Sequence, residues 1–284
     1  MLGTLVYDQI MRLEAQLYGF SAHEHTIGAV QWHYWNNHNE GKPKLVLLHG
    51  FSATHSVWLR CARHLTRDFH ILIPDLPGHG ESSYVQELNY SVPNQTSRLH
   101  ELLMHLQWRD TLIAGNSMGG FMAAQYALDF AHNTRGIICV DPAGVISQRP
   151  SKLEQQARQG RNPFFMDEAS QFDTFYAMTM AKPPFMPKFI RKALALQYVA
   201  QKSRLQHIFK DFYNLNEFLN ERLGDIRTPV LLLWGAKDEL IDISCAPIWQ
   251  QGTQGISVVW DDLGHMPMLE APNLVAQEIK RFLP

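Results

Sequence analysis

Short apolar runs that alternate with helical segments constrain the fold of this chain more than any other feature. Most runs are rich in Val, Ile and Leu at consecutive positions, so both faces of the strand must be covered. Strands of this kind, separated by helices, build a mostly parallel sheet flanked by helices, which is the α/β class. The predicted strands cover residues 29–35, 44–48, 71–74, 111–114, 136–140, 229–234 and 256–260. The predicted helices cover residues 56–65, 94–106, 118–130, 244–251 and 272–282.

One long interval lacks any strand pattern. Residues 145–223 read as several helices interrupted by proline, and the interval is too long for a loop in a compact domain. We therefore predict a helical cap at 145–223, inserted into a core formed by residues 1–144 and 224–284.

The first twenty residues carry apolar side chains at helical spacing, which predicts an N-terminal helix over 1–20. Such a helix packs on its own protein or lies in a lipid interface. Interfacial helices are rich in Lys and Arg, and this one is not, so we favour packing on the protein. Weak peripheral contact with a lipid interface stays open as the alternative.

The segment Gly115-Asn116-Ser117-Met118-Gly119-Gly120 lies between a predicted strand and a predicted helix. A serine on so sharp a turn needs glycine neighbours, because the backbone is strained and the helix packs close to the strand. The turn exposes the Ser117 hydroxyl at the carboxyl edge of the sheet. Ser117 is therefore the candidate nucleophile, and the Met118 N–H at the helix start is a candidate donor to a developing oxyanion.

A second oxyanion donor is expected from the loop after an early strand. His49-Gly50-Phe51 follows the strand at 44–48, so the Phe51 N–H is the candidate, and its ring would line the acyl pocket.

Two further residues follow late strands and complete a catalytic triad. A serine hydroxyl needs a base, and an imidazole base needs a carboxylate to fix its tautomer and stabilise its charged form. Asp238 follows the strand at 229–234, and His265 follows the last strand. The chain order Ser, Asp, His is the one found with a nucleophile on a strand-to-helix turn such as the one at Ser117 (the nucleophile elbow). Asp141, at the end of the strand at 136–140, is the rival acid.

These motifs together resemble the α/β-hydrolase superfamily over nearly the whole chain. They are similar to the capped esterase/lipase branch that includes monoacylglycerol lipases and a group of bacterial lipases. The resemblance implies the α/β-hydrolase fold with a cap, hydrolysis of carboxylic esters, and a pocket-shaping role for residues 75–82. The matching segments are residues 49–53 with Trp58, residues 75–82, the elbow at Ser117, residues 234–238, Gly264-His265 and residues 270–272.

The composition narrows the substrate and partners. A net charge of −2 provides no basic field for nucleic acid, and no Cys/His spacing indicates a metal; no cofactor is expected. A cap rich in Phe and Met suits an uncharged acyl chain, so the predicted substrate is a small ester, either a monoacylglycerol or a short-to-medium-chain ester. The candidate pocket residues are Phe51, Phe164, Phe175, Met178, Phe185 and Met266.

Two other functions remain open. The same triad serves carbon–carbon hydrolases of diketones. The sequence around Ser117 also resembles that group, although Met266-Pro267-Met268 after the histidine differs from it. A hydrolase-like binding protein without activity would usually lack a triad member. Three widely spaced cysteines and no recognisable signal peptide favour the cytoplasm.

Overall fold

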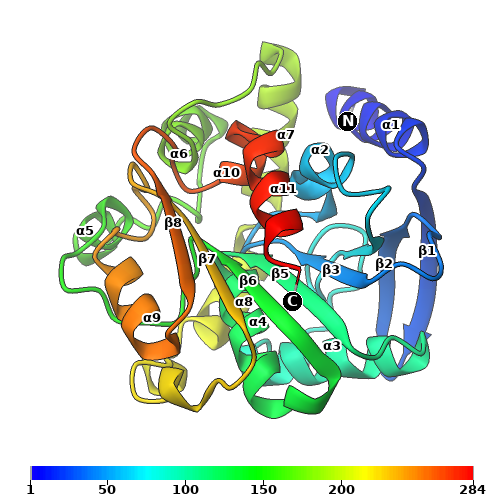
Figure 1. Ribbon diagram of the computed structural model, residues 1–284. Coiled ribbons are helices and arrows are strands. Elements are labelled where there is room, and N and C mark those ends of the chain that lie inside the picture. Colours follow the sequence, from blue (N-terminus) through cyan, green and yellow to red (C-terminus); the bar gives the residue numbers. More distant parts are fainter. Residues whose placement is uncertain (1, 284) are drawn as a thin grey trace.

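The computed structural model of the protein describes residues 2–283. Its centre is an eight-stranded sheet in the order β1-β2-β4-β3-β5-β6-β7-β8 (Figure 1). The first two strands join the sheet in antiparallel fashion, and the other six run parallel. The strands are β1 (Ser21–Ile27), β2 (Val30–Asn36), β3 (Lys44–Leu48), β4 (His70–Pro74), β5 (Thr111–Asn116), β6 (Thr134–Val140), β7 (Val230–Gly235) and β8 (Ile256–Trp260).

The predicted strands are present, with small differences at their ends. Strands β3 to β7 are buried almost throughout, as expected for strands covered on both faces. Strand β1 was missed by the sequence analysis. It is an edge strand of mostly polar, exposed residues, so it carries no run of apolar side chains that could mark it.

Helices cover both faces of the sheet (Figure 1). One buried cluster lies under α3 (Val92–His105), α4 (Met118–Asp129) and α9 (Cys245–Thr253), and a second lies under α2 (Leu59–Ala62) and α11 (Pro272–Arg281). The predicted helix at 56–65 is wrong in detail: a 3-10 turn at His55–Trp58 is followed by only one α-helical turn. The short α10 (Pro267–Glu270) precedes α11.

Residues 145–223, predicted as a helical cap, contain no strand and carry four α-helices between β6 and β7. These are α5 (Lys152–Arg158), α6 (Phe172–Thr179), α7 (Lys188–Ala200) and α8 (Lys202–Phe212). The N-terminal helix α1 (Leu2–Leu17) packs against α7, as Figure 1 shows near its upper right. Only part of its apolar stripe is buried: Met11 and Ala15 are covered, whereas Leu13 and Leu17 are exposed.

The three cysteines are free and buried, and Cys139 lies in the core of β6 as its apolar setting suggested. None of the helices within residues 2–283 has both the length and the hydropathy needed to cross a membrane.

Candidate active site

Ser117 occupies a strained turn between β5 and α4. Its backbone angles, φ of 57° and ψ of −117°, lie in a region that residues other than glycine rarely adopt. The turn is possible because glycines flank it: a Cβ on Gly115 would lie 2.0 Å from the Gly119 carbonyl oxygen, and one on Gly119 would lie 2.6 Å from the Leu48 carbonyl oxygen. The chain therefore uses two glycines to hold the strained serine at the carboxyl edge of the sheet.

The predicted acid and base meet although 27 residues separate them. His265 Nδ1 lies 2.7 Å from Asp238 Oδ2. The other carboxylate oxygen of Asp238 accepts backbone N–H groups of Leu240 at 2.7 Å and Ile241 at 2.9 Å. Both side chains are buried, which strengthens the interaction between carboxylate and imidazole. This contact fixes the imidazole with Nδ1–H toward Asp238, so Nε2 is the nitrogen that faces away from the carboxylate.

The rival acid Asp141 is buried beside this pair. Its Oδ1 accepts the backbone N–H of Gly235 at 2.9 Å, while the hydrogen bond to His265 comes from Asp238. The geometry therefore favours Asp238 as the orienting acid.

Asn116 connects the serine turn to the histidine loop, a role that the sequence did not reveal. Its Nδ2 donates to the His265 carbonyl at 2.9 Å and to the Val140 carbonyl at 3.1 Å. The side chain is almost fully buried. Ser117 and His265 line the same cavity, so this bridge sets the position of one relative to the other.

The loop after β3 is held from two sides. His49 is fully buried, and burial lowers its pKa, so it is neutral; Nδ1–H donates to the Gly50 carbonyl at 2.8 Å and Nε2 accepts the Leu76 N–H at 2.9 Å. On the other side, the Tyr198 hydroxyl of α7 donates to the Ser52 carbonyl at 3.2 Å and lies 3.1 Å from Ser52 Oγ. Burial raises the pKa of Tyr198 to about 12, so the hydroxyl stays protonated. The Phe51 N–H thus belongs to a loop held by Leu76 on one side and by Tyr198 of α7 on the other.

Asp75 is the centre of a buried polar cluster next to this loop. Asp75 accepts the backbone N–H of His55 and its Nδ1, both at 2.8 Å, and the N–H of Glu81 at 2.8 Å. Burial opposes ionisation of Asp75, but the charge of His55 and the hydrogen bonds from His33 and His55 hold its pKa well below the usual value. These hydrogen bonds hold the chain over residues 75–82 in place.

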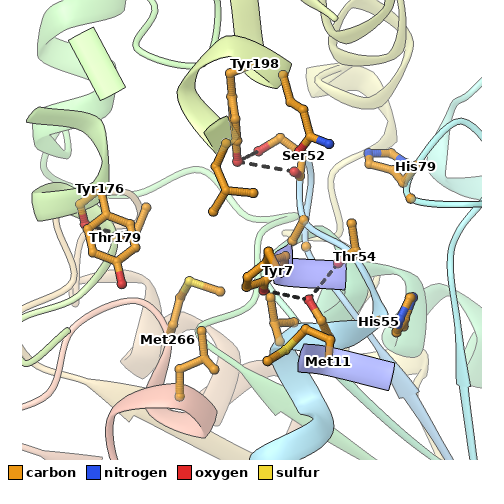
Figure 2. Close-up of a pocket in the computed structure, with 18 of the residues that line it drawn as sticks. Tyr7, Met11, Ser52, Thr54, His55, His79, Tyr176, Thr179, Tyr198 and Met266 are labelled. Carbon is orange, nitrogen blue, oxygen red and sulfur yellow. Dashed lines mark hydrogen bonds between the residues drawn. The ribbon is translucent and has the colours of Figure 1, made fainter. Parts of the chain in front are cut away.

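A cavity of about 490 Å³ connects Ser117 and His265 to the surface, between the carboxyl edge of the sheet, the helices of residues 145–223 and α1. Figure 2 shows its hydroxyl groups, with the Tyr198 and Ser52 pair on one side and Tyr7 on another. The Tyr7 hydroxyl lies 3.2 Å from Ser56 Oγ. The remaining wall is mostly apolar and includes Met11, Phe172, Phe175, Met180, Ile190, Leu194, Met266 and Leu269.

Four of the predicted pocket residues, Phe51, Phe164, Phe175 and Met266, line this cavity, and Phe185 lies on its rim with 91% of its surface exposed. Met178 was a wrong prediction. It lies on the side of α6 that faces α5, where its sulfur is 3.7 Å from Gln156 Nε2, and it does not border the cavity.

A second, smaller cavity of about 70 Å³ borders Ser117 on the other side of the ring pair Phe51 and Phe164, whose centroids are 5.0 Å apart. Its wall is formed mainly by the aromatic side chains of α8 and the chain that follows it, Phe209, Phe212, Tyr213 and Phe218.

The contribution of α1 to the large cavity was also missed. Tyr7, Met11 and Arg12 border it, and Arg12 binds Glu81 of the core at 2.8 Å. An amphipathic pattern predicts that a helix packs, but the surface on which it packs depends on residues distant in the chain.

Within residues 2–283, two groups of side chains have the spacing of metal ligands: His33, His55 and Glu81, and Asp141, Asp238 and His265. In each, a histidine Nδ1 is already hydrogen-bonded to a carboxylate, His55 to Asp75 and His265 to Asp238. Internal hydrogen bonds thus account for both groups, and the prediction that the protein needs no metal stays a prediction.

Known proteins resemble this chain over most of its length. Residues 43–272 match the family model of the alpha/beta hydrolase fold. Lipase 1 of Psychrobacter immobilis is 31% identical over 254 residues, covering 88% of this chain and 79% of that protein. Monoacylglycerol lipase ABHD6 of Mus musculus is 26% identical, covering 85% and 75%. A solved structure of a membrane phospholipase A, described as a bacterial virulence factor, aligns with a TM-score of 0.95 at 31% identity, covering 99% of this chain and 91% of that one.

The chain therefore belongs to the α/β-hydrolase family. Its similarity to named lipases places it among the lipase-type ester hydrolases of that family. The fold class, the family resemblance and the enzyme class predicted from the sequence are confirmed.

Proposed function

We propose that this protein hydrolyses carboxylic esters through an acyl-enzyme on Ser117, with His265 as base and Asp238 as the acid that orients it. The observation that carries the proposal is the 2.7 Å contact between His265 and Asp238 beside a strained serine in a shared cavity. A serine that borders a cavity and an imidazole oriented by a carboxylate in the same cavity are features that support acyl transfer.

The reaction follows from these positions. Ser117 Oγ attacks the ester carbonyl while His265 Nε2 takes its proton, and the N–H groups of Phe51 and Met118 stabilise the oxyanion. Collapse of the intermediate expels the alcohol, which takes the proton from His265. A water that gives its proton to His265 then attacks the acyl carbonyl, and the acid leaves as Ser117 regains its proton.

The cavity favours an uncharged acyl ester as substrate. Its walls combine apolar side chains with hydroxyl groups, and Ser117 lies between a large and a small chamber. Such a lining suits a chain of methylenes with an alcohol part that forms hydrogen bonds. We propose a monoacylglycerol or a short-to-medium-chain ester, received under a cap formed by residues 145–223.

The test compares wild type with Ser117→Ala on p-nitrophenyl esters of increasing chain length and on monoacylglycerols. We expect hydrolysis to fall by about 10⁴-fold or more, and fluorophosphonate labelling to disappear. Ser97→Ala is a matched control, because this exposed serine lies on α3 away from the cavity. Persistent labelling of the Ser117 variant would refute the assignment, and a sharp preference for acetyl esters would contradict the substrate class.

We further propose that the rim of the cavity makes weak contact with a lipid surface. Phe185 and Phe189 have 91% and 55% of their surfaces exposed, and the exposed cations Lys182, Lys188 and Lys192 lie close to them in the chain. Exposed aromatic rings flanked by cations suit an anionic lipid interface.

Vesicles of phosphatidylcholine, with and without phosphatidylglycerol, test this contact by co-sedimentation. The double variant Phe185→Ser/Phe189→Ser should lose binding, and Leu274→Ser, which removes a similarly exposed apolar residue on α11, should keep it. Equal binding by all three proteins would contradict the proposal.

A further inference from the structure

Two buried carboxyl groups lie side by side behind the catalytic histidine. Asp141 directly follows β6 and has no exposed surface, and Asp238 follows β7, the neighbouring strand. One carboxylate oxygen of Asp141, one of Asp238 and one ring nitrogen of His265 all lie within 4.8 Å of one another. Two negative charges so close in a buried site would repel strongly, so one of the two carboxyl groups is expected to carry a proton.

The hydrogen-bond partners of the two carboxyls are unequal. Asp238 receives two backbone N–H groups on one oxygen and His265 on the other, so three donors stabilise its anion. Asp141 receives one N–H, from Gly235, on Oδ1. Its Oδ2 is buried and meets no donor among residues 2–283. The site therefore holds the negative charge on Asp238.

The surrounding charges act in the same direction. Burial raises the pKa of Asp141 well above its usual value, and the charges of Asp238 and of Glu270 on α10 raise it further. The imidazole of His265, which could supply a compensating positive charge, is already engaged by Asp238.

We propose that Asp141 is held as a neutral carboxylic acid whose Oδ2–H donates a hydrogen bond to the Asp238 carboxylate. Asp141 is then a positioning residue that acts on His265 through Asp238. A single negative charge faces the imidazole, enough to orient it and to stabilise its charged form during the reaction. A second charge would keep the imidazole protonated and unable to act as a base at neutral pH.

This inference rests on the proposed function, and the pH profile of kcat/KM tests it with three variants. Asp141→Asn keeps a neutral donor at the same place, so kcat/KM should stay within about threefold and the acid limb should not move. Asp141→Ala removes the donor, and the acid limb should move up by about one pH unit. Asp238→Asn should lower kcat by about 10⁴-fold.

Other outcomes overturn the inference. An ionised Asp141 would add a negative charge beside His265, and Asp141→Asn would then shift the acid limb down by about two units. If kcat instead fell by about 10³-fold or more in Asp141→Asn and was kept in Asp238→Asn, Asp141 would be the acid that orients His265. That result would overturn the inference but leave the serine mechanism intact. Fluorophosphonate labelling counts active sites in each preparation, so a poorly folded variant is corrected for.

An infrared difference spectrum between wild type and Asp141→Asn supplies an independent reading. The wild type should show the absorbance of a protonated, buried carboxyl group that the variant lacks. A carboxylate band in its place overturns the proposal without reference to activity.

Discussion

Asn116→Ala separates the positioning of the catalytic histidine from the general stability of the fold. The substitution removes two hydrogen bonds, to the carbonyls of His265 and Val140. The Val140 carbonyl keeps the N–H of Ser117 at 3.0 Å, so the main loss falls on His265. A buried carbonyl deprived of its donor costs about 1–3 kcal/mol, which lowers the melting temperature by roughly 2–6 °C in a chain of this length.

The effect on catalysis should be larger than this stability loss suggests. The bridge ties the histidine loop to the residue before the nucleophile, and a misplacement of about 1 Å between reacting groups costs about 100-fold in rate. We expect kcat to fall by about 10- to 100-fold at saturating ester, with a smaller change in KM, because the Asn116 side chain holds the His265 loop and is only 1% exposed.

Asn133→Ala is the matched control. Asn133 is also a buried asparagine with two hydrogen bonds, to the Tyr126 hydroxyl at 2.9 Å and the Trp108 carbonyl at 3.4 Å. It precedes β6 and so lies at the opposite end of the sheet from Ser117. Thermal unfolding and ester kinetics are measured for both variants, with active sites counted by fluorophosphonate. If Asn116→Ala loses no more kcat than Asn133→Ala, the positioning role is wrong.

Three further variants probe the parts around the triad. Tyr198→Phe should lower kcat/KM by about 3- to 10-fold, because the loop at Ser52 loses the hydrogen bond that holds it. Tyr84→Phe, away from the cavity, should leave kcat/KM unchanged. Equal effects of the two variants would exclude a role for Tyr198 in holding this loop. Gly115→Ala should abolish labelling, because its Cβ would overlap the Gly119 carbonyl, and Gly224→Ala, with 4.0 Å of clearance, should label normally. Asp75→Asn should weaken the fall of the free energy of unfolding at acid pH. Because the pKa of Asp75 is lowered in the folded state, its ionised form contributes fully to stability above about pH 4, and the contribution is lost below. Urea unfolding between pH 5 and pH 3 checks this, and parallel slopes would count against it.

The sequence by itself determined the architecture, and it supplied the residues proposed for the chemistry. Strands buried on both faces must be apolar at consecutive positions, so β3 to β7 were visible as runs, and the turn at Ser117 could be recognised because only glycines fit beside it. The order of Ser117, Asp238 and His265, which follow β5, β7 and β8, was readable because parallel strands place their carboxyl ends at one edge. Strand β1, with its exposed polar pattern, offered no such signal.

Only the tertiary structure decided how the site is supported and enclosed. The bridge from Asn116 to His265 spans 149 residues, and the contact of Tyr198 with Ser52 spans 146. The place of α1 at the cavity and the orientation of Met178 toward α5 likewise depend on which surfaces meet. Local patterns encode which face of an element is apolar, because that is a property of neighbouring residues. They do not encode which distant group an amide or hydroxyl will reach, because that is settled only when the chain has packed.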